Sequence, residues 1–394
     1  MVWRAVHYRA KDQDIFRLIM RSTSKIPYIF TAALFIRAIY GFGFSWSSLD
    51  SPHYINLALS IRTGAFALSG IPETSLPMLF SLVISPFPTV EAALLAQCVV
   101  GSLTCALLYW IARNCRISSW GAWLYVFAPL TIHYTAVIMP DTLLIFLTVL
   151  AVYFWTAGKY ILAGIVFGLA ALAGPTILPL LVFAVFLSFL LKYDKKPLIL
   201  IASAAILVCL PWIIRNSLIE GEPTLTQRSA YRTNLLHGAF SSDETGSALD
   251  GQAPVYPYCE KERECGRIAA ERITGQPFSW IKARFEQYPR LFIDTGYYLT
   301  ASYPPRILLV LIQIIIGIFA ILGLRGMSFP LWIVPLFLML YYLPLRTESQ
   351  YFLSAIPFIC LSAGISIKRS FSKLRKEPEA GAAKSKKRRR SAVN

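Results

Sequence analysis

The chain has 394 residues, of which 56% are hydrophobic and only 15% are charged, and its formal net charge is +17. Soluble domains contain about 25% charged and about 45–50% apolar residues, so this composition argues against a cytosolic enzyme. The apolar residues come in long blocks, which predicts an all-α polytopic integral membrane protein.

Most of the positive charge lies at the two ends of the chain. Residues 1–25 carry six basic and two acidic side chains, and residues 368–394 carry eleven and two. The stretch from Arg215 to Arg306 contains eleven side chains of each sign and is neutral. We interpret the basic ends as cytoplasmic segments, of which the C-terminal one is a disordered tail near anionic lipid headgroups. A nucleic-acid site is not expected.

Ten transmembrane helices are predicted, because a bilayer core of about 30 Å requires roughly 20 apolar residues per span. They lie at about residues 26–44, 89–112, 119–136, 140–157, 160–176, 177–191, 197–214, 305–324, 328–345 and 350–367. Ten spans place both termini on one side of the membrane, where the connecting loops are also basic, so both termini are predicted to be cytoplasmic. A bacterial inner or plasma membrane is expected, or the endoplasmic reticulum membrane in a eukaryote.

The spans divide the chain into a membrane module at residues 26–214 and C-terminal transmembrane helices at residues 305–367. Two segments are predicted on the non-cytoplasmic face. The first outer loop, residues 45–88, contains an amphipathic stretch that begins near Ser51 and predicts a helix lying in the interface. The second segment, residues 215–304, is long enough for a small loop domain.

Two of the seven cysteines, Cys259 and Cys265, lie in the second outer segment. The compartment outside the cytoplasm is oxidising, which favours a local disulfide between them. Their spacing does not fit a zinc site, and the four histidines lie in separate segments. The sequence has no P-loop, Rossmann glycine pattern or nucleophile elbow.

The acidic residues of the apolar part are the candidates for chemistry. Asp50 directly follows the first predicted span, and Asp141 follows Met139-Pro140 at the outer start of the fourth. Both are predicted at the same membrane face, where ionisable groups are costly unless they are paired or functional. Each acid also fits a helix cap, and the two roles are not exclusive. Glu348, between the last two spans, is a third candidate, with a solvated loop charge as the alternative.

Arg215 closes the run Pro211-Trp-Ile-Ile-Arg-Asn216 at the outer mouth of the seventh predicted span. A guanidinium group binds phosphate through two parallel hydrogen bonds. Contact between the side chain and lipid headgroups is the alternative. The predicted depth suits the phosphate of a lipid substrate.

These motifs resemble the GT-C superfamily of polyprenyl-phosphate-sugar-dependent membrane glycosyltransferases, which includes protein O-mannosyltransferases and the lipid A aminoarabinose transferase. Asp50 to Tyr54 resembles the first outer loop that carries the catalytic acid in that family. Residues 137–141 resemble its Pro-Asp entry to the fourth helix, and residues 211–216 its Pro-Trp-x-x-Arg-Asn signature. Residues 348–351 resemble its Glu-x-x-Tyr pattern. Many relatives have a second acid where this chain has Ser51.

The resemblance implies an inverting transfer of a hexose or pentose from a polyprenyl-phosphate donor to a lipid, glycan or protein acceptor. Asp50 is then the catalytic base, and Arg215 stabilises the leaving phosphate. Asp141 and Glu348 orient the acceptor, the arginine or a divalent cation.

The resemblance also places Tyr54 and Tyr351 in the substrate site. If the site holds Mg or Mn, Asp50 and Asp141 are the expected ligands. The alternatives are a transporter or flippase of a lipid-linked sugar and a non-catalytic assembly subunit.

Overall fold

The structure is a computed structural model. It describes residues 25–43, 50–64, 77–221, 223, 225, 229–240, 262–287, 291, 306–345 and 349–371. Within these ranges the regular structure is helical, without a β-strand, which confirms the all-helical prediction there.

Four helices are long and apolar enough to cross a membrane. All four coincide with predicted spans, and the last of them opens with the 3-10 turn η3 (Ser349–Ala355). They are α2 (Ile26–Gly43), α6 (Val90–Asn114), α12 (Lys195–Glu220) and the final helix Gln350–Phe371.

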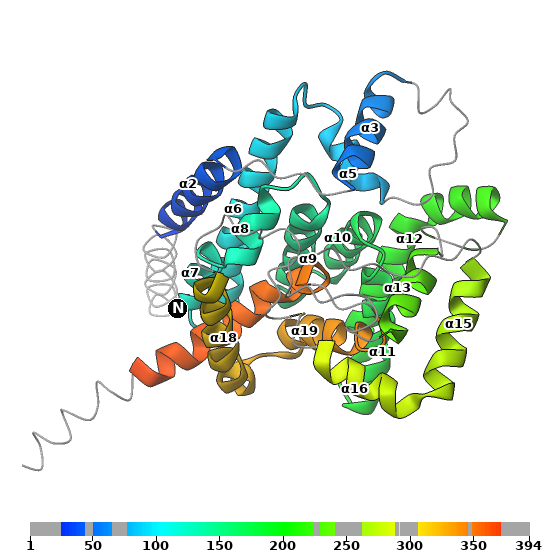
Figure 1. Ribbon diagram of the computed structural model, residues 1–394. Helices are drawn as coiled ribbons and strands as arrows, with labels where there is room; N and C mark the ends of the chain where they lie inside the picture. Colours follow the sequence, from blue (N-terminus) through cyan, green and yellow to red (C-terminus); the bar gives the residue numbers. More distant parts are fainter. Residues whose placement is uncertain are drawn as a thin grey trace, which may run out of the picture.

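Five further apolar helical stretches are shorter and lie at the positions of five other predicted spans. They are α9 (Asp141–Thr156), α10 (Tyr160–Ala173), α11 (Ile177–Leu190), α19 (Phe329–Tyr341) and Leu311–Gly326, which comprises most of α18 (Arg306–Gly323) and the 3-10 turn η2 (Leu324–Gly326). Figure 1 shows α2 at one edge of the bundle and α15 at the opposite edge, with α9 and α10 between them.

The prediction of one continuous span at residues 119–136 is wrong. This segment forms two short helices, α7 (Trp120–Val126) and α8 (Pro129–Thr135). Pro129 has no amide hydrogen to donate, and its ring disfavours helical geometry at the preceding residue. Ala128 accordingly has an extended backbone, and Pro129 occupies the first turn of α8, where a proline is tolerated.

The helix that contains the seventh predicted span, α12, continues to Glu220, six residues past the predicted end of the span at about residue 214. Pro211 lies inside this helix without ending it. The helix stops at Gly221, whose φ of 72° is the left-handed conformation that commonly terminates helices. Arg215 therefore lies within a helix.

Close contact between α10 and α12 is possible because two glycines lie one turn apart on α10. A Cβ atom at Gly164 would be 2.5 Å from the carbonyl oxygen of Ile201, and one at Gly168 would be 2.6 Å from Cβ of Val208. Small residues spaced by four positions let helix backbones approach closely in membranes. These glycines therefore fix the packing of α12 in the bundle.

Two short helices cover one end of α6. They are α3 (Ser51–Arg62), where the interfacial helix was predicted, and α5 (Met78–Ile84), which the sequence pattern did not indicate. Tyr54 of α3 and Phe80 of α5 form an edge-to-face ring contact with centroids 5.4 Å apart. Both rings belong to a buried cluster with Leu94 of α6 and Ile138, so this layer is fixed to the bundle.

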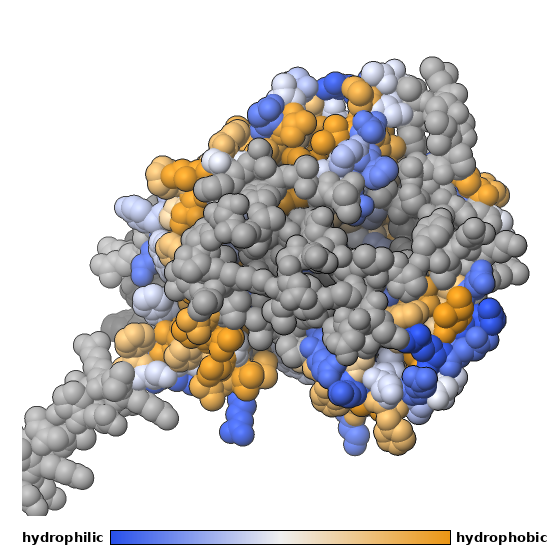
Figure 2. Space-filling view, in the orientation of Figure 1, coloured by the Kyte–Doolittle hydropathy of each residue, from blue (hydrophilic) through white to orange (hydrophobic). Residues whose placement is uncertain are grey.

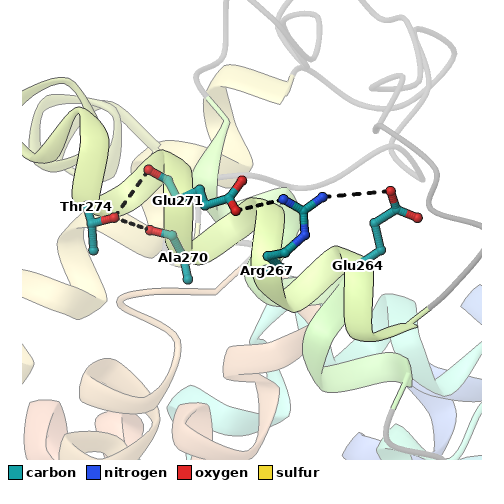
Figure 3. Close-up of polar contacts among 5 residues, drawn as sticks. All are labelled: Glu264, Arg267, Ala270, Glu271 and Thr274. Carbon is teal, nitrogen blue, oxygen red and sulfur yellow. Dashed lines mark hydrogen bonds and ion pairs between the residues drawn. The ribbon is translucent and has the colours of Figure 1, made fainter.

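Three helices are described in the second outer segment: α13 (Ser229–Ala239), α15 (Glu262–Gly275) and α16 (Pro277–Gln287). One face of α15 packs on α13 through Cys265 and Ala269. The opposite face carries the exposed ion pair between Arg267 and Glu271, with N and O 2.7 Å apart (Figure 3). Cys265 is disulfide-bonded, and its predicted partner Cys259 lies outside the described residues.

Candidate functional site

Asp50 occupies the N-cap position of α3, with Pro52 in the first turn of the helix. Its backbone carbonyl accepts hydrogen bonds from the amides of His53 and Tyr54, at 3.0 and 3.3 Å. Its side chain makes no capping hydrogen bond, so the capping role that the sequence allowed is wrong. Asp50 is exposed at the surface.

Asp141 is the first residue of α9, and Pro140 occupies the N-cap position. The predicted capping role is therefore also wrong here, although a negative charge in the first turn is favoured by the helix dipole. Asp141 is half-buried, and its Oδ2 atom is buried without a hydrogen-bond partner. Burying an unpaired carboxylate oxygen costs free energy, and such atoms are typical of binding or catalytic sites.

Tyr54 lies within electrostatic reach of both carboxylates. Burial, followed by the negative charges of Asp141 and Asp50, raises the pKa of Tyr54 well above its ordinary value. The two acids also interact with each other electrostatically. Segments that are far apart in the sequence thus bring Asp50, Tyr54 and Asp141 to one end of the bundle. Tyr54 stays protonated at neutral pH and is available there as a hydrogen-bond donor.

A buried amide on α6 holds the backbone that leads into Asp141. Nε2 of Gln97 donates to the carbonyl oxygens of Thr135 and Val137, at 3.0 and 2.7 Å. Thr135 is the last residue of α8 and Val137 follows it, so no amide of this helix is available to bond their carbonyls. Gln97 therefore stabilises the turn between α8 and α9 and fixes the position of Asp141.

Two further contacts hold α8 between α2 and α9. The hydroxyl of Tyr40 lies 2.9 Å from Nδ1 of His133, and the hydroxyl of Thr142 donates to the carbonyl of Tyr134 at 3.2 Å. Sequence reasoning missed Gln97 and Tyr40 as positioning residues. Their signal was available, because a polar side chain in an otherwise apolar span needs an internal partner.

Two stacked tyrosines connect the segments on either side of residues 346–348 to the same site. The rings of Tyr342 and Tyr351 are stacked with centroids 4.9 Å apart, and the charge of Asp141 acts on Tyr342. The Tyr351 hydroxyl donates to Oδ1 of Asn234 on α13 at 3.5 Å. Tyr351 therefore links α13 to the Asp141 region. Sequence reasoning missed Tyr342, which carried no signal beyond being an aromatic residue at the end of a span.

Arg215 interacts with its neighbours on α12. Its guanidinium donates to Oδ1 of Asn216 at 2.7 Å and lies over the ring of Trp212, 4.4 Å from the centroid. Asn216 in turn donates to the carbonyl of Leu225 at 2.7 Å. Among the described residues, no contact joins Arg215 to either carboxylate. The predicted site residue Glu348 lies outside the described residues.

Arg37, in the middle of α2, is a charged residue that the sequence reasoning did not consider. Its side chain is fully buried and lies over the ring of Tyr125. It donates to the carbonyls of Ala33 and Tyr125 at 3.5 Å each, and its Nε has no partner. None of the described acids forms an ion pair with it. A lone buried charge in a candidate membrane span is expensive and typical of functional sites.

The described residues contain no group of three or more histidine, cysteine, aspartate or glutamate side chains arranged to hold a metal ion. Asp50 and Asp141 provide two carboxylates, one of which has the unpartnered oxygen described above. Mg²⁺ is commonly bound by one or two carboxylates together with water and substrate phosphate. Carboxylates are therefore present of the kind that Mg²⁺ takes, and a divalent cation belongs to the proposal below.

No protein-family model matches this sequence, and a comparison with curated proteins finds no match.

Proposed function

We propose that this chain is an inverting membrane glycosyltransferase that moves a sugar from a polyprenyl-phosphate donor to a lipid, glycan or protein acceptor. The observation that carries the proposal is that Tyr54, four residues after Asp50, packs in one buried cluster with Ile138, three residues before Asp141, within electrostatic reach of both carboxylates. An exposed carboxylate beside a protonated hydroxyl and a second, half-buried carboxylate is a suitable arrangement for activating an acceptor hydroxyl and orienting a sugar.

In this proposal the bundle has ten membrane crossings: the four long helices, the five shorter apolar helices and the interrupted pair α7–α8. The basic termini are cytoplasmic by the positive-inside rule, and the end that carries Asp50 and Asp141 is on the other face. The membrane is a bacterial inner or plasma membrane, or that of the endoplasmic reticulum. The membrane location is supported by four helices that are long and apolar enough to cross a bilayer.

The proposed chemistry is a direct displacement. Asp50 takes the proton from the acceptor hydroxyl, whose oxygen attacks the anomeric carbon. The bond between this carbon and the lipid phosphate breaks, and the phosphate leaves as an anion, so the anomeric centre is inverted. Tyr54 and Asp141 bond sugar or acceptor hydroxyls, Tyr351 contributes from the segment after α19, and Glu348 is the further acid that the sequence predicts for the site.

Two groups are proposed to stabilise the negative charge of the leaving phosphate. Arg215 carries a guanidinium group suited to phosphate, and it reaches the donor if its side chain leaves Trp212 and Asn216. A bound Mg or Mn ion held by Asp50 and Asp141 would neutralise part of the same charge.

The test uses the purified chain in lipid nanodiscs with a panel of polyprenyl-phosphate sugars, and measures the release of polyprenyl phosphate. We expect Asp50→Asn to lower the rate by about 10²–10⁴-fold, the usual contribution of a general base. The matched control is Asp194→Asn. Asp194 caps the N-terminus of α12, where its side chain accepts a hydrogen bond from the Lys196 amide at 3.1 Å, and it is not part of the proposed site. This control is expected to keep the wild-type rate. Full activity of Asp50→Asn would contradict its role as base.

A transporter or flippase of a lipid-linked sugar is the second candidate, and two observations favour it. Arg37 is a buried charge within α2, and the segment at α7 and α8 is an interrupted helix. Both features are typical of transport sites near the middle of the membrane. Translocation of a fluorescent polyprenyl-phosphate sugar by liposomes containing the wild type, with loss in Arg37→Met and no sugar transfer, would favour this candidate over the transferase.

A further inference from the structure

The helix α16 differs from its neighbour α15 in the side chains that it exposes. The exposed face of α15 carries Glu264, Arg267, Glu271 and Thr274, which are polar (Figure 3). The exposed surface of α16 includes Phe278 and Phe285, whose side chains are 86% and 77% exposed, and Ile281. Figure 2 shows hydrophobic residues beside hydrophilic ones over the lower part of the molecule, where Figure 1 places α16.

The apolar, charged and buried residues of α16 occupy adjoining sectors of the helix surface. With 3.6 residues per turn, Phe278, Ile281 and Phe285 lie on one stripe of the helix surface. Lys282 and Glu286 lie beside this stripe on an exposed charged face, where they form an ion pair with N and O 3.7 Å apart. A helix that lies only between protein and water needs no exposed apolar stripe.

The third face of α16 is anchored to the bundle through Arg284, which is buried. Its guanidinium donates to the carbonyl of Leu345 at 2.8 Å and also to Oε1 of Gln287. Nε2 of Gln287 donates to the carbonyl of Phe240 at 3.0 Å. This bond joins α16 to Leu345, four residues after α19 ends at Tyr341. Tyr342, at the same end of α19, interacts electrostatically with Asp141.

The anchor of α16 lies close in sequence to exposed apolar residues of the shorter apolar helix α19. Leu340, in the last turn of α19, and Leu343, two residues before the Leu345 anchor, are exposed. The bond of Arg284 to Leu345 therefore holds α16 at the end of an apolar helix whose own last residues are exposed and apolar. This is the position of the boundary between lipid and water if α19 crosses the bilayer.

We propose that α16 is an interfacial helix whose Phe278, Ile281 and Phe285 side chains insert into the lipid bilayer, with Lys282 and Glu286 facing water. Its partner is the membrane surface on the side that carries Asp50 and Asp141. Amphipathic helices of this kind bury their apolar side at the boundary between headgroups and acyl chains. The function of this contact is to hold the outer helices against the membrane, next to the site. The inference does not depend on the transferase proposal.

The test measures the surroundings of single spin labels on α16 in nanodiscs of phosphatidylcholine and phosphatidylglycerol. Labels replace Phe278 and Phe285 on the apolar stripe and Ser279 and Lys282 on the polar side, each through a cysteine substitution. Thr274 on α15 is the matched control for a water-facing helix. Wild type treated with the same label is the blank for the native cysteines, of which four are free and buried and one is free and half-buried.

We expect a several-fold higher ratio of oxygen to nickel-chelate accessibility at positions 278 and 285 than at positions 279, 282 and 274, because oxygen partitions into lipid and the chelate stays in water. An equally high chelate accessibility at all five positions would overturn the proposal. It would equally be overturned if both reagents failed to reach positions 278 and 285, since another part of the protein or a second copy would then cover the stripe. The labelled positions are exposed, so these substitutions preserve the buried contacts of α16.

Discussion

The inner helices that position Asp141 and the outer helices α13, α15 and α16 are held in place in different ways. In the inner region, side chains of α2, α6 and α9 bond the backbone or side chains of α8, and all of these groups are buried or nearly so. Among the described residues, Arg284 of α16 bonds the Leu345 carbonyl, and Tyr351 bonds Asn234 of α13. Gln287 joins α16 to the end of α13 by bonding the Phe240 carbonyl. The inner contacts therefore fix the backbone that leads into Asp141, whereas the outer helices are joined to each other and to the segments around Leu345 and Tyr351.

The strongest test of this difference is Gln97→Leu. Leucine has a similar size but cannot donate, so the buried carbonyls of Thr135 and Val137 each lose a donor. At about 1–3 kcal/mol for each unsatisfied group, the free energy of unfolding in detergent is expected to fall by roughly 2–6 kcal/mol. The control Ser102→Ala removes only a bond to the Cys98 carbonyl one turn back on the same helix. Equal losses in the two variants would contradict the positioning role of Gln97.

Arg284→Met tests the outer region. It keeps an apolar stem but removes the bonds to Leu345 and Gln287, and hydrogen bonds of charged groups contribute about 1.5–3 kcal/mol. We expect faster hydrogen exchange of the α13 and α15 amides, with unchanged protection in α6 and α9. Lys282→Met, at an exposed position of the same helix, is the control that is expected to leave all four helices unchanged. Faster exchange throughout the bundle would show that the two regions are not separate.

Gly164→Ala tests how closely the inner helices α10 and α12 are packed. The added methyl group overlaps the Ile201 carbonyl of α12, and overpacking of this kind costs about 1–3 kcal/mol. Gly317→Ala is the matched control, because a Cβ there has no neighbour within 4 Å and helix propensity favours alanine. Thermal unfolding is expected to show a lower Tm for the first variant and an equal or higher Tm for the second. A Tm that falls equally in both would contradict the close packing of α10 and α12.

The smallest expected effect is that of Tyr54→Phe, which removes a hydroxyl from the site and leaves its ring contact with Phe80. Loss of one hydrogen bond to substrate, at about 1 kcal/mol, lowers the rate of sugar transfer by about five- to tenfold. Because the pKa of Tyr54 is raised, its hydroxyl stays protonated from neutral pH to above about pH 10. The variant is therefore expected to have a pH profile of the same shape as the wild type, and a changed alkaline limb would contradict this.

Part of the site was predictable from the sequence, because an acid next to a long apolar block is conspicuous. Asp50 and Asp141 could be selected on this ground, and the charge pattern placed them on one face. Their common electrostatic interaction with Tyr54 depends on how α3 packs on α6 and Ile138. The capping alternatives failed for a local reason: Pro140 takes the N-cap position before Asp141, and the backbone of Asp50 is helical.

Other parts of the site carried too weak a signal. A single proline was sufficient to divide residues 119–136 into two helices, although the hydropathy of the segment is continuous. Gln97 and Arg37 were visible as polar residues in apolar spans, but their partners are backbone carbonyls, which have no signature in the sequence.

The sequence by itself determined that this is a helical chain built around long apolar segments, since composition and block length decide which residues avoid water. It also determined the short list of costly polar residues. Only the tertiary structure decided which of them meet, because Asp50 and Tyr54 belong to α3 and Asp141 to α9, and the packing of Tyr54 with Ile138 brings these distant segments together. The three faces of α16 were likewise decided by packing, since burial of Arg284 against Leu345 selects the side of the helix that remains exposed.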